Sequence, residues 1–206
     1  VEDLKRGVLR LIGEPMLRYR EDPVRMLRAV RFAVKLGLRI DTASEQPLTE
    51  LGGLLEQISP ARLFDETLKL FHGGMALQTF EALRHYELFA RLFPQADAAL
   101  AHQHAGFPNT LVGQALANTD LRVAEDKPVT PAFLVAALLW EPYEQHYQEL
   151  LSRGVAEHDA ENLAADTVIS QQVARLAIPR RFTQMTREIW HLQQRLAHPT
   201  PRRARK

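Results

Sequence analysis

Cysteine is absent from this sequence, which excludes disulfides, thiolate metal sites and cysteine nucleophiles. A chain without cysteine fits a reducing compartment, so we expect a cytoplasmic protein. Long apolar runs are also missing, because no stretch reaches the roughly 18 residues that a membrane-spanning helix needs. Alternating apolar and polar positions, the pattern of a half-buried strand, are nearly absent as well. These absences point away from membrane-spanning, disulfide-stabilised and β-rich proteins.

The residues that are present suffice for a folded protein. Of the 206 residues, 46% are hydrophobic and 25% are charged, which supports a buried core in one or two domains and excludes a wholly disordered chain. The N-terminal stretch Val1–Arg6 has neither an initiator methionine nor an apolar signal region. We therefore expect that this sequence begins within a longer protein.

The net charge of +1 is distributed unevenly along the chain. Residues 1–40 carry +5, residues 41–174 carry −12 and residues 175–206 carry +8. Clustered cations raise the local potential and release counterions when they bind phosphates, so two basic ends indicate a polyanionic partner. The alternative is that these cations lie on solvated helix faces and in a basic tail.

Helical periodicity dominates from Asp22 onward. Asp22 followed by Pro23 predicts a helix start, and Gly37 predicts its end; Ser59 followed by Pro60 predicts a second start of the same kind. The best strand candidate lies between Gly7 and Gly13, and the predicted fold class is all-α with at most one short strand near the N-terminus. Helices are expected over residues 23–36, 43–58, 61–71, 75–93, 108–122, 131–152, 156–176 and 181–197. Three aromatic residues at helical positions are expected in the core rather than as stacking platforms for bases: Trp140, Tyr143 and Trp190.

The helix predicted over residues 23–36 has two distinct faces. One face carries four cations, which repel one another by tenths of a kcal/mol per close pair, a cost that a bound phosphate would remove. Carboxylates from elsewhere in the fold would remove it equally well, and the sequence leaves both possibilities open. At 100° per residue, four cations share one face: Arg25, Arg28, Arg31 and Lys35. The opposite face is expected in the core: Met26, Leu27, Ala29, Val30, Ala33 and Val34.

Asp22 and Arg25 are three residues apart, so their side chains can project together from the first turn. A carboxylate beside a guanidinium presents an acceptor next to a donor. The Watson–Crick edges of adenine and cytosine offer the complement, whereas guanine and uracil would leave buried groups unpaired at about 1–3 kcal/mol each. The pair could therefore select adenine and cytosine together without separating them. The alternative is a helix-capping aspartate with an ordinary local ion pair.

Three segments, in order, resemble one enzyme family. Residues 21–32 (EDPVRMLRAVRF) resemble motif D of the class II template-independent nucleotidyltransferases, which comprise bacterial poly(A) polymerases and CCA-adding enzymes. Residues 58–70 (ISPARLFDETLKL) resemble motif E of the family, and residues 3–15 (DLKRGVLRLIGEP) resemble the stretch that joins its catalytic head to its neck. The resemblance implies multi-helical neck and body domains: a connector over residues 1–18, a neck over 19–75, a helical RNA-binding body over 76–197 and an arginine-rich tail over 198–206.

The resemblance also implies roles for residues of the nucleotide site. Asp22 and Arg25 would read the base of an ATP substrate, and Arg28 and Arg31 would complete the nucleotide site on the same face.

Other implied roles lie around that site or outside the chain. Arg62 and Glu66, one helical turn apart, would brace the motif D helix without contacting the nucleotide. Mg²⁺ would be held by catalytic aspartates of a head domain that we expect upstream of this chain. No glycine-rich phosphate turn or paired metal-binding carboxylate motif occurs in the sequence. His158-Asp159 resembles the dipeptide of HD phosphohydrolases but lacks the further ligands of such a site. We therefore expect no catalytic residue, no metal site and no polymerising activity in the chain alone.

The implied macromolecular partner is an RNA 3′ end, and protein partners are left undetermined. Residues 176–190 resemble the body of bacterial poly(A) polymerases, which favours polyadenylation of RNA. CCA addition to tRNA remains the alternative within the family, and a non-catalytic helical RNA-binding module remains the alternative outside it. The expected RNA contacts are cations: Lys35, Arg180, Arg181, Arg202, Arg203, Arg205 and Lys206.

Overall fold

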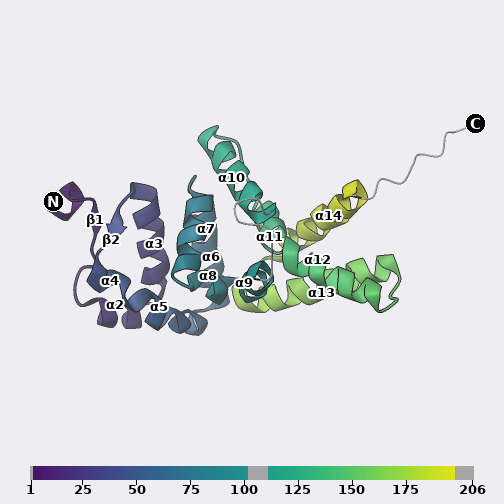
Figure 1. Ribbon diagram of the computed structural model, residues 1–206, viewed down its shortest axis with the longest axis horizontal. Coiled ribbons are helices and arrows are strands. Elements are labelled where there is room, and N and C mark those ends of the chain that lie inside the picture. The colour runs from purple at the N-terminus through teal and green to yellow at the C-terminus, as the bar shows by residue number, and fades with distance from the viewer. Residues whose placement is uncertain (1, 102–110, 198–206) are drawn as a thin grey trace, which may run out of the picture.

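A computed structural model describes residues 2–101 and 111–197, and it forms an elongated array of helices (Figure 1). Its N-terminal elements lie at one end and α14 reaches toward the other. None of the described helices is long and apolar enough to cross a bilayer. In chain order the elements are α1 (Glu2–Lys5), β1 (Val8–Leu9), α2 (Pro15–Glu21), α3 (Val24–Leu36), β2 (Arg39–Ile40), α4 (Thr42–Glu45), α5 (Pro47–Leu51), the 3-10 helix η1 (Gly52–Gln57), α6 (Pro60–Phe71), α7 (Ala76–His85), α8 (Leu88–Leu92), α9 (Pro94–Ala101), α10 (Leu111–Ala124), α11 (Pro131–Leu138), α12 (Trp140–Ser152), α13 (Glu157–Leu176) and α14 (Arg180–Ala197).

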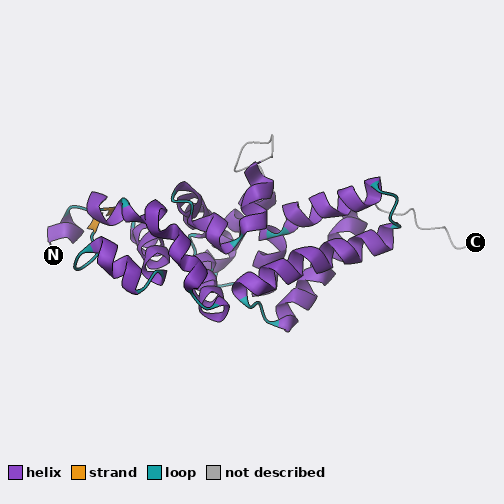
Figure 2. Cartoon of the chain, turned by 90° about the horizontal axis from the view of Figure 1, so that it is seen from below, coloured by secondary structure: helices purple, strands orange, loops and turns teal. Residues whose placement is uncertain are grey.

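The predicted all-α class is confirmed, with one correction near the N-terminus (Figure 2). β1 lies within the predicted strand region, but it pairs in parallel with β2, a second strand that the sequence did not predict. The Arg39 N–H donates to the Gly7 carbonyl at 3.0 Å, and the Asp41 N–H donates to the Leu9 carbonyl at 2.9 Å. A lone strand would leave such backbone groups unpaired. The expected single strand is therefore one half of a two-stranded ladder.

Local signals at both ends of α3 explain where the helix starts and stops. Asp22 Oδ1 accepts a hydrogen bond from the Val24 N–H at 3.3 Å, and the helix starts at Val24, directly after Pro23. Gly37 ends the helix in the left-handed region at φ +61°, a conformation that glycine adopts without steric cost. The predicted helix is confirmed, with its first residue shifted by one.

The apolar face of α3 is buried as predicted, except at its last position. Val34 is only half-buried, because it lies near the exposed end of the helix. α3 packs against α6 and α7, and these contacts position its cationic face beside α6. The fully buried members are Met26, Leu27, Ala29, Val30 and Ala33.

Three helices that were predicted as continuous are interrupted. The region 43–58 divides into α4, α5 and η1, because Pro47 starts a new helix and Gly52 begins a 3-10 turn. The region 75–93 divides at Glu87, whose φ of +58° cannot continue an α-helix. The region 131–152 divides at Leu139. The sequence also did not predict α1, α2 and α9.

The C-terminal helices enclose an aromatic core. α11 packs against α14, and α12 packs against α13. Trp190 stacks on Tyr143 with ring centroids 4.4 Å apart, and its indole N–H donates to the Ala136 carbonyl at 3.0 Å. Both aromatic residues are 1% exposed, which confirms the predicted core positions, whereas Trp140 is half-buried. A buried indole with its N–H paired is a well-satisfied core residue.

Candidate functional site

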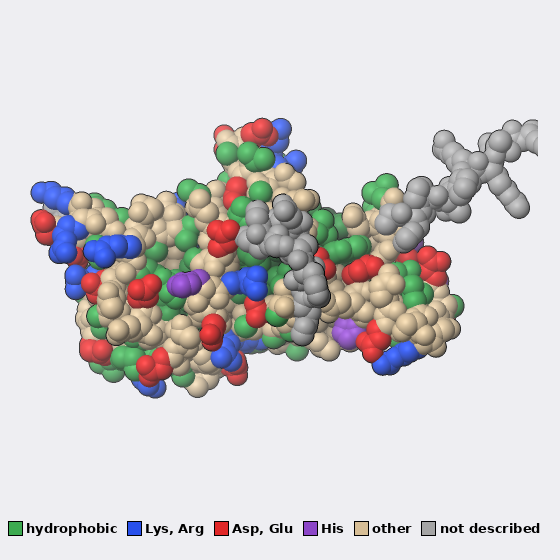
Figure 3. Space-filling view, viewed as in Figure 1, with side chains coloured by type: hydrophobic (Ala, Val, Ile, Leu, Met, Phe, Trp, Pro, Cys, Tyr) green, Lys and Arg blue, Asp and Glu red, His purple; other side chains and the backbone are tan. Residues whose placement is uncertain are grey.

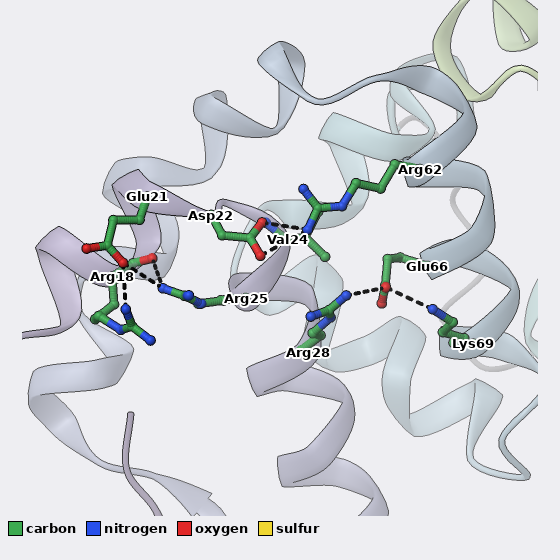
Figure 4. A network of polar contacts seen from close by, with 9 residues as sticks. All are labelled: Arg18, Glu21, Asp22, Val24, Arg25, Arg28, Arg62, Glu66 and Lys69. Atoms are coloured by element: carbon green, nitrogen blue, oxygen red, sulfur yellow. Dashed lines mark hydrogen bonds and ion pairs between the residues drawn. The ribbon is translucent and has the colours of Figure 1, made fainter. Parts of the chain in front are cut away.

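The candidate site lies where α3 meets α2 and α6, and Figure 4 shows its polar contacts. Asp22 precedes α3, and its carboxylate accepts from Arg62 Nη2 with both oxygens, each at 3.0 Å. Arg62 lies in the first turn of α6, so this ion pair joins the start of one helix to the start of another. The side chains are 20% and 44% exposed, and a ligand in solution can therefore reach them.

Arg25 has different partners. Its Nη1 donates to the Arg18 carbonyl at 2.9 Å and to Glu21 Oε2 at 3.1 Å. The same Glu21 oxygen accepts from Arg18 Nη1 at 2.6 Å. Hydrogen bonding from Arg25 and the charge of both arginines hold the pKa of Glu21 below its usual value, against the opposing effect of desolvation. Arg25 is thus tied to α2 rather than to Asp22.

The structure does not bring Asp22 and Arg25 together as the spacing suggested. Figure 4 shows Asp22 directed toward Arg62 and Arg25 directed toward Glu21. Both groups still have hydrogen-bonding capacity, because a carboxylate has about four acceptor sites and a guanidinium has five N–H donors. The acceptor-beside-donor arrangement is found between Asp22 and Arg62 in this state.

Glu66 forms a second link between α3 and α6. Its Oε1 accepts from Arg28 Nη2 at 2.8 Å and from Lys69 Nζ at 3.0 Å. The Glu66 side chain is only 4% exposed. Burial alone would raise the pKa of this carboxyl group, but the hydrogen bonds and charges of Arg28 and Lys69 outweigh burial and hold the pKa below its usual value. Glu66 and Arg62 thus both reach from α6 to the motif D region, which gives their predicted bracing role a geometric basis.

The four cations that share one face of α3 fall into two pairs. Arg25 and Arg28 have carboxylate partners, as the ligand-free alternative required. Arg31 and Lys35 have no ion-pair partner among the described residues, and Arg31 Nε is buried without a hydrogen bond. The Arg31 guanidinium lies 4.8 Å from the centroid of the Phe32 ring. Neutralisation by carboxylates therefore accounts for only half of this face.

The remaining predicted contacts lie apart from α3. Arg180 and Arg181 begin α14, and the Arg181 guanidinium lies 4.7 Å from the Phe182 ring centroid. On the face drawn in Figure 3, lysine and arginine side chains gather at the N-terminal end, in line with the charge of residues 1–40. The predicted tail contacts lie outside the described residues: Arg202, Arg203, Arg205 and Lys206.

Several partners in this network were missed from the sequence. The pairing of Glu21 with Arg25 and that of Glu66 with Lys69 follow helical spacings of four and three, so a search for such pairs would have found them. Asp22 and Arg62 are 40 residues apart and carry no local signal of their contact. Within the described ranges no three His, Asp or Glu side chains come together as a metal site requires.

Comparisons with known proteins match this chain along nearly its whole length. A family profile described as "Probable RNA and SrmB-binding site of polymerase A" matches residues 37–100, and one described as "Polymerase A arginine-rich C-terminus" matches residues 153–206. Poly(A) polymerase I of Escherichia coli O157:H7 is 45% identical over 205 residues, which cover 99% of this chain and 44% of that protein. Poly(A) polymerase I of Haemophilus influenzae is 45% identical over 201 residues, which cover 97% of this chain and 44% of that protein. The chain thus spans less than half the length of these relatives.

Similarity to CCA-adding enzymes is more restricted. The CCA-adding enzyme of Leuconostoc mesenteroides is 40% identical over 85 residues, which cover 41% of this chain and 21% of that protein. A solved CCA-adding enzyme in an apo form superposes with a TM-score of 0.45 at 18% identity, over 95% of this chain and 52% of that one, a likeness too distant to support a functional argument. The chain belongs to the family of template-independent nucleotidyltransferases that contains the bacterial poly(A) polymerases and the CCA-adding enzymes.

Proposed function

We propose that this chain is the neck and body of a poly(A) polymerase that adds AMP from ATP to RNA 3′ ends in the cytoplasm. In this proposal the neck reads the base of ATP, and the basic surfaces of the neck, the body and the arginine-rich tail hold the RNA. The extent of the matches supports polyadenylation over CCA addition, because the poly(A) polymerase match covers 99% of the chain and the CCA-adding match covers 41%.

The observation that carries the base-reading role is the position of Asp22 and Arg25 at the start of α3, accessible and with hydrogen-bonding groups to spare. To contact one base edge together, Arg25 has to release Glu21 and turn toward Asp22. Glu21 then keeps Arg18 as a partner, so the exchange leaves no carboxylate unpaired. Adenine would donate from its amino group to Asp22 and accept at N1 from Arg25.

The described residues do not fit a catalytic Mg²⁺ ion, because no cluster of three acidic or histidine side chains occurs among them. We therefore place the metal and its aspartates in a part of the enzyme beyond this sequence, and we assign no catalytic residue to this chain. The reaction itself is tested in the whole enzyme: addition of a long run of AMP to an RNA supports poly(A) polymerase, whereas termination after CCA supports the alternative.

Nucleotide binding by this chain tests the base-reading role directly. Isothermal titration with the four nucleoside triphosphates should show ATP and CTP binding more tightly than GTP and UTP. Asp22→Ala and Arg25→Ala should each weaken ATP binding about tenfold, because each removes one hydrogen bond worth roughly 1–3 kcal/mol.

Two further variants make this titration discriminating. Arg153→Ala breaks a remote ion pair with Glu149 and should bind ATP like the unmodified chain. If Arg62→Ala weakens ATP binding while Arg25→Ala does not, the base is read by Asp22 together with Arg62. Unchanged ATP affinity in a folded Asp22→Ala variant would contradict base reading at this site.

A further inference from the structure

The two unpaired cations of α3 line a pocket between α3, α6 and α7, helices that pack against one another (Figure 1). The pocket encloses about 480 Å³ of empty space, part of it open to solvent. Its lining contains three cations and, within the described part of the chain, no carboxylate. The lining residues are Arg31, Phe32, Lys35, Lys69, Leu70, Gly73, Met75 and Thr79.

The described residues around this pocket do not neutralise its positive charge. Glu66 accepts from Lys69, but it shares its one bonding oxygen with Arg28. Asp120 approaches the loop before α7, where its carboxylate is engaged by the backbone N–H groups of Ala76 and Leu77. The C-terminal ends of α3 and α6 contribute roughly half a negative charge each, which leaves the three cations in excess. A pocket with this excess attracts an anion.

The Arg31 side chain gives the most specific indication of which anion the pocket binds. Its Nε lies below the surface with no hydrogen-bond partner in residues 2–101 and 111–197, and a buried guanidinium N–H without an acceptor is costly. Its guanidinium carbon lies over the Phe32 ring, 4.8 Å from the centroid, a cation–π contact that holds the group beside the ring. A phosphate oxygen is the acceptor that matches an arginine fork, since guanidinium groups bind phosphates through paired N–H donors.

We infer that this pocket binds a backbone phosphate of single-stranded RNA through Arg31, Lys35 and Lys69, with the neighbouring base stacked on the face of the Phe32 ring that Arg31 does not cover. Phe32 is 42% exposed and Met75 is 38% exposed, so apolar surface lies beside the cations as a nucleotide requires. The inference deepens the proposed function and rests on it, because RNA is the ligand in both. It assigns Arg31 to RNA binding, whereas the family resemblance implied a role for Arg31 in the nucleotide site.

The position of the pocket along α3 favours RNA over ATP as the source of the phosphate. Val24, the first residue of α3 after Asp22 and Pro23, and Lys35 are 11 residues apart, which is about 17 Å along a helix axis. ATP has a single base, and the proposed function places that base at Asp22. A second base stacked on Phe32 therefore belongs to another nucleotide chain. Lys69, Gly73 and Met75 also fall within residues 37–100, the segment that matches the profile for a probable RNA-binding site.

Salt-dependent RNA titrations of this chain test the inference. Binding of labelled oligo(A) and oligo(U) is measured by fluorescence anisotropy at several salt concentrations. The double variant Arg31→Gln, Lys35→Gln should bind both RNAs about tenfold more weakly. Its log–log salt slope should be flatter by about 0.7 for each RNA phosphate that the variant no longer neutralises. Its affinity for ATP should equal that of the unmodified chain.

Two single variants separate charge from stacking. Phe32→Ala should weaken RNA binding roughly five- to 150-fold with an unchanged salt slope, because base stacking involves no counterion release. The single variant Arg31→Lys should keep the salt slope of the unmodified chain but lose part of the affinity, since a lysine lacks the planar fork. Arg153→Gln, which breaks a pair with Glu149 at the C-terminal end of α12, is the matched control and should change neither quantity.

Three other outcomes of these titrations would each contradict the inference, and each has a different meaning for the proposed function. If the double variant retains the full slope and affinity, RNA binds elsewhere, and the proposed function stands without this pocket. If the variant loses ATP binding and keeps RNA binding, the pocket holds the phosphates of the substrate nucleotide. If the unmodified chain binds neither RNA, the RNA-holding part of the proposed function fails together with the inference.

Discussion

Among single residues, Glu66 has the least access to water in the polar network that joins α3 to α6. Its side chain is 4% exposed, whereas its partners Arg28 and Lys69 are 40% and 52% exposed. Arg62 is 44% exposed and bonds to Asp22 at the same junction. Ion pairs at the surface are worth under about 1 kcal/mol, and a buried charge depends far more on its partners. The two links are therefore expected to differ in their contribution to stability.

Glu66→Ala should lower the free energy of unfolding by about 1–3 kcal/mol, because it removes a buried acceptor of two charge-assisted hydrogen bonds. The cost stays below the roughly 3–5 kcal/mol of a fully buried pair, since the two cations left behind can reach water. Arg62→Ala should cost under about 1 kcal/mol. Chemical denaturation of both variants measures the difference, and equal losses of stability would contradict the distinction.

The ionisation of Glu66 should make the stability of the chain depend on pH in the acid range. Its pKa is lowered in the folded chain relative to the usual 4.5, so the unfolded chain binds a proton first as the pH falls. The stabilisation is therefore complete above about pH 4.5 and is lost as the pH falls through the folded pKa. Glu66→Gln should remove this part of the acid dependence; an acid profile equal to that of the unmodified chain would assign the dependence to other carboxylates.

At the scale of helices and strands, the sequence predicts what local chemistry determines. Proline and glycine locate the ends of α3 and the start of α6, and periodicity locates α13 and α14. β2 has only two residues and exists because β1 lies beside it, so no local pattern announces it. The left-handed residue Glu87 likewise looks like an ordinary helical position in the sequence.

The same limit applies to the site. The cationic face of α3 follows from periodicity alone, but its division into neutralised and free cations depends on Glu66, 38 residues from Arg28. Burial of a side chain among distant helices cannot be read from its neighbours in the sequence. Contacts between residues three or four positions apart were therefore within reach of the sequence, and contacts between residues distant in sequence were not.

The start of α7 depends on another helix. Asp120 of α10 accepts from the Ala76 N–H at 2.6 Å and from the Leu77 N–H at 3.1 Å. The first N–H groups of a helix have no partner within it, and Met75, which precedes α7, has no side-chain oxygen that could cap them. Asp120 thus caps α7 from a distance of more than 40 residues in sequence.

Asp120→Ala should destabilise the chain by about 0.5–2 kcal/mol, the usual cost of losing an N-terminal cap. Asp120→Asn should cost less, because an amide oxygen still accepts one hydrogen bond. Hydrogen exchange should show faster exchange at Ala76 and Leu77 in the alanine variant. Glu81→Ala, an exposed change on α7 itself, provides the baseline; equal stability of Asp120→Ala and Glu81→Ala would show that the cap contributes nothing.

For the whole molecule, the four tyrosines share one electrostatic property. Burial raises the pKa of Tyr19 from 10.0 to about 12, and its hydroxyl donates to the Ser44 carbonyl at 2.9 Å. Burial is also the largest cause of the raised pKa of Tyr86, Tyr143 and Tyr147. The folded chain thus holds all four phenols in their neutral form beyond the pH at which a free tyrosine ionises.

Stability should therefore fall as the pH rises above about 10, because the unfolded tyrosines release protons there and the folded ones retain them. Phenolate absorbance and far-ultraviolet circular dichroism, followed together in an alkaline titration, should change in the same pH interval. Ionisation of the tyrosines near pH 10 with an unchanged helical signal would contradict this coupling.

The aromatic stack of Trp190 on Tyr143 has a consequence for how this protein is observed. Both tryptophans of the chain, Trp140 and Trp190, lie in the C-terminal helices, and none lies in residues 1–139. Indole emission therefore reports on the environment of α11, α12 and α14, and it does not change when α2, α3 and α6 open locally. If tryptophan emission and the circular dichroism of the helices change together during denaturation, the N-terminal and C-terminal helices unfold as one cooperative unit.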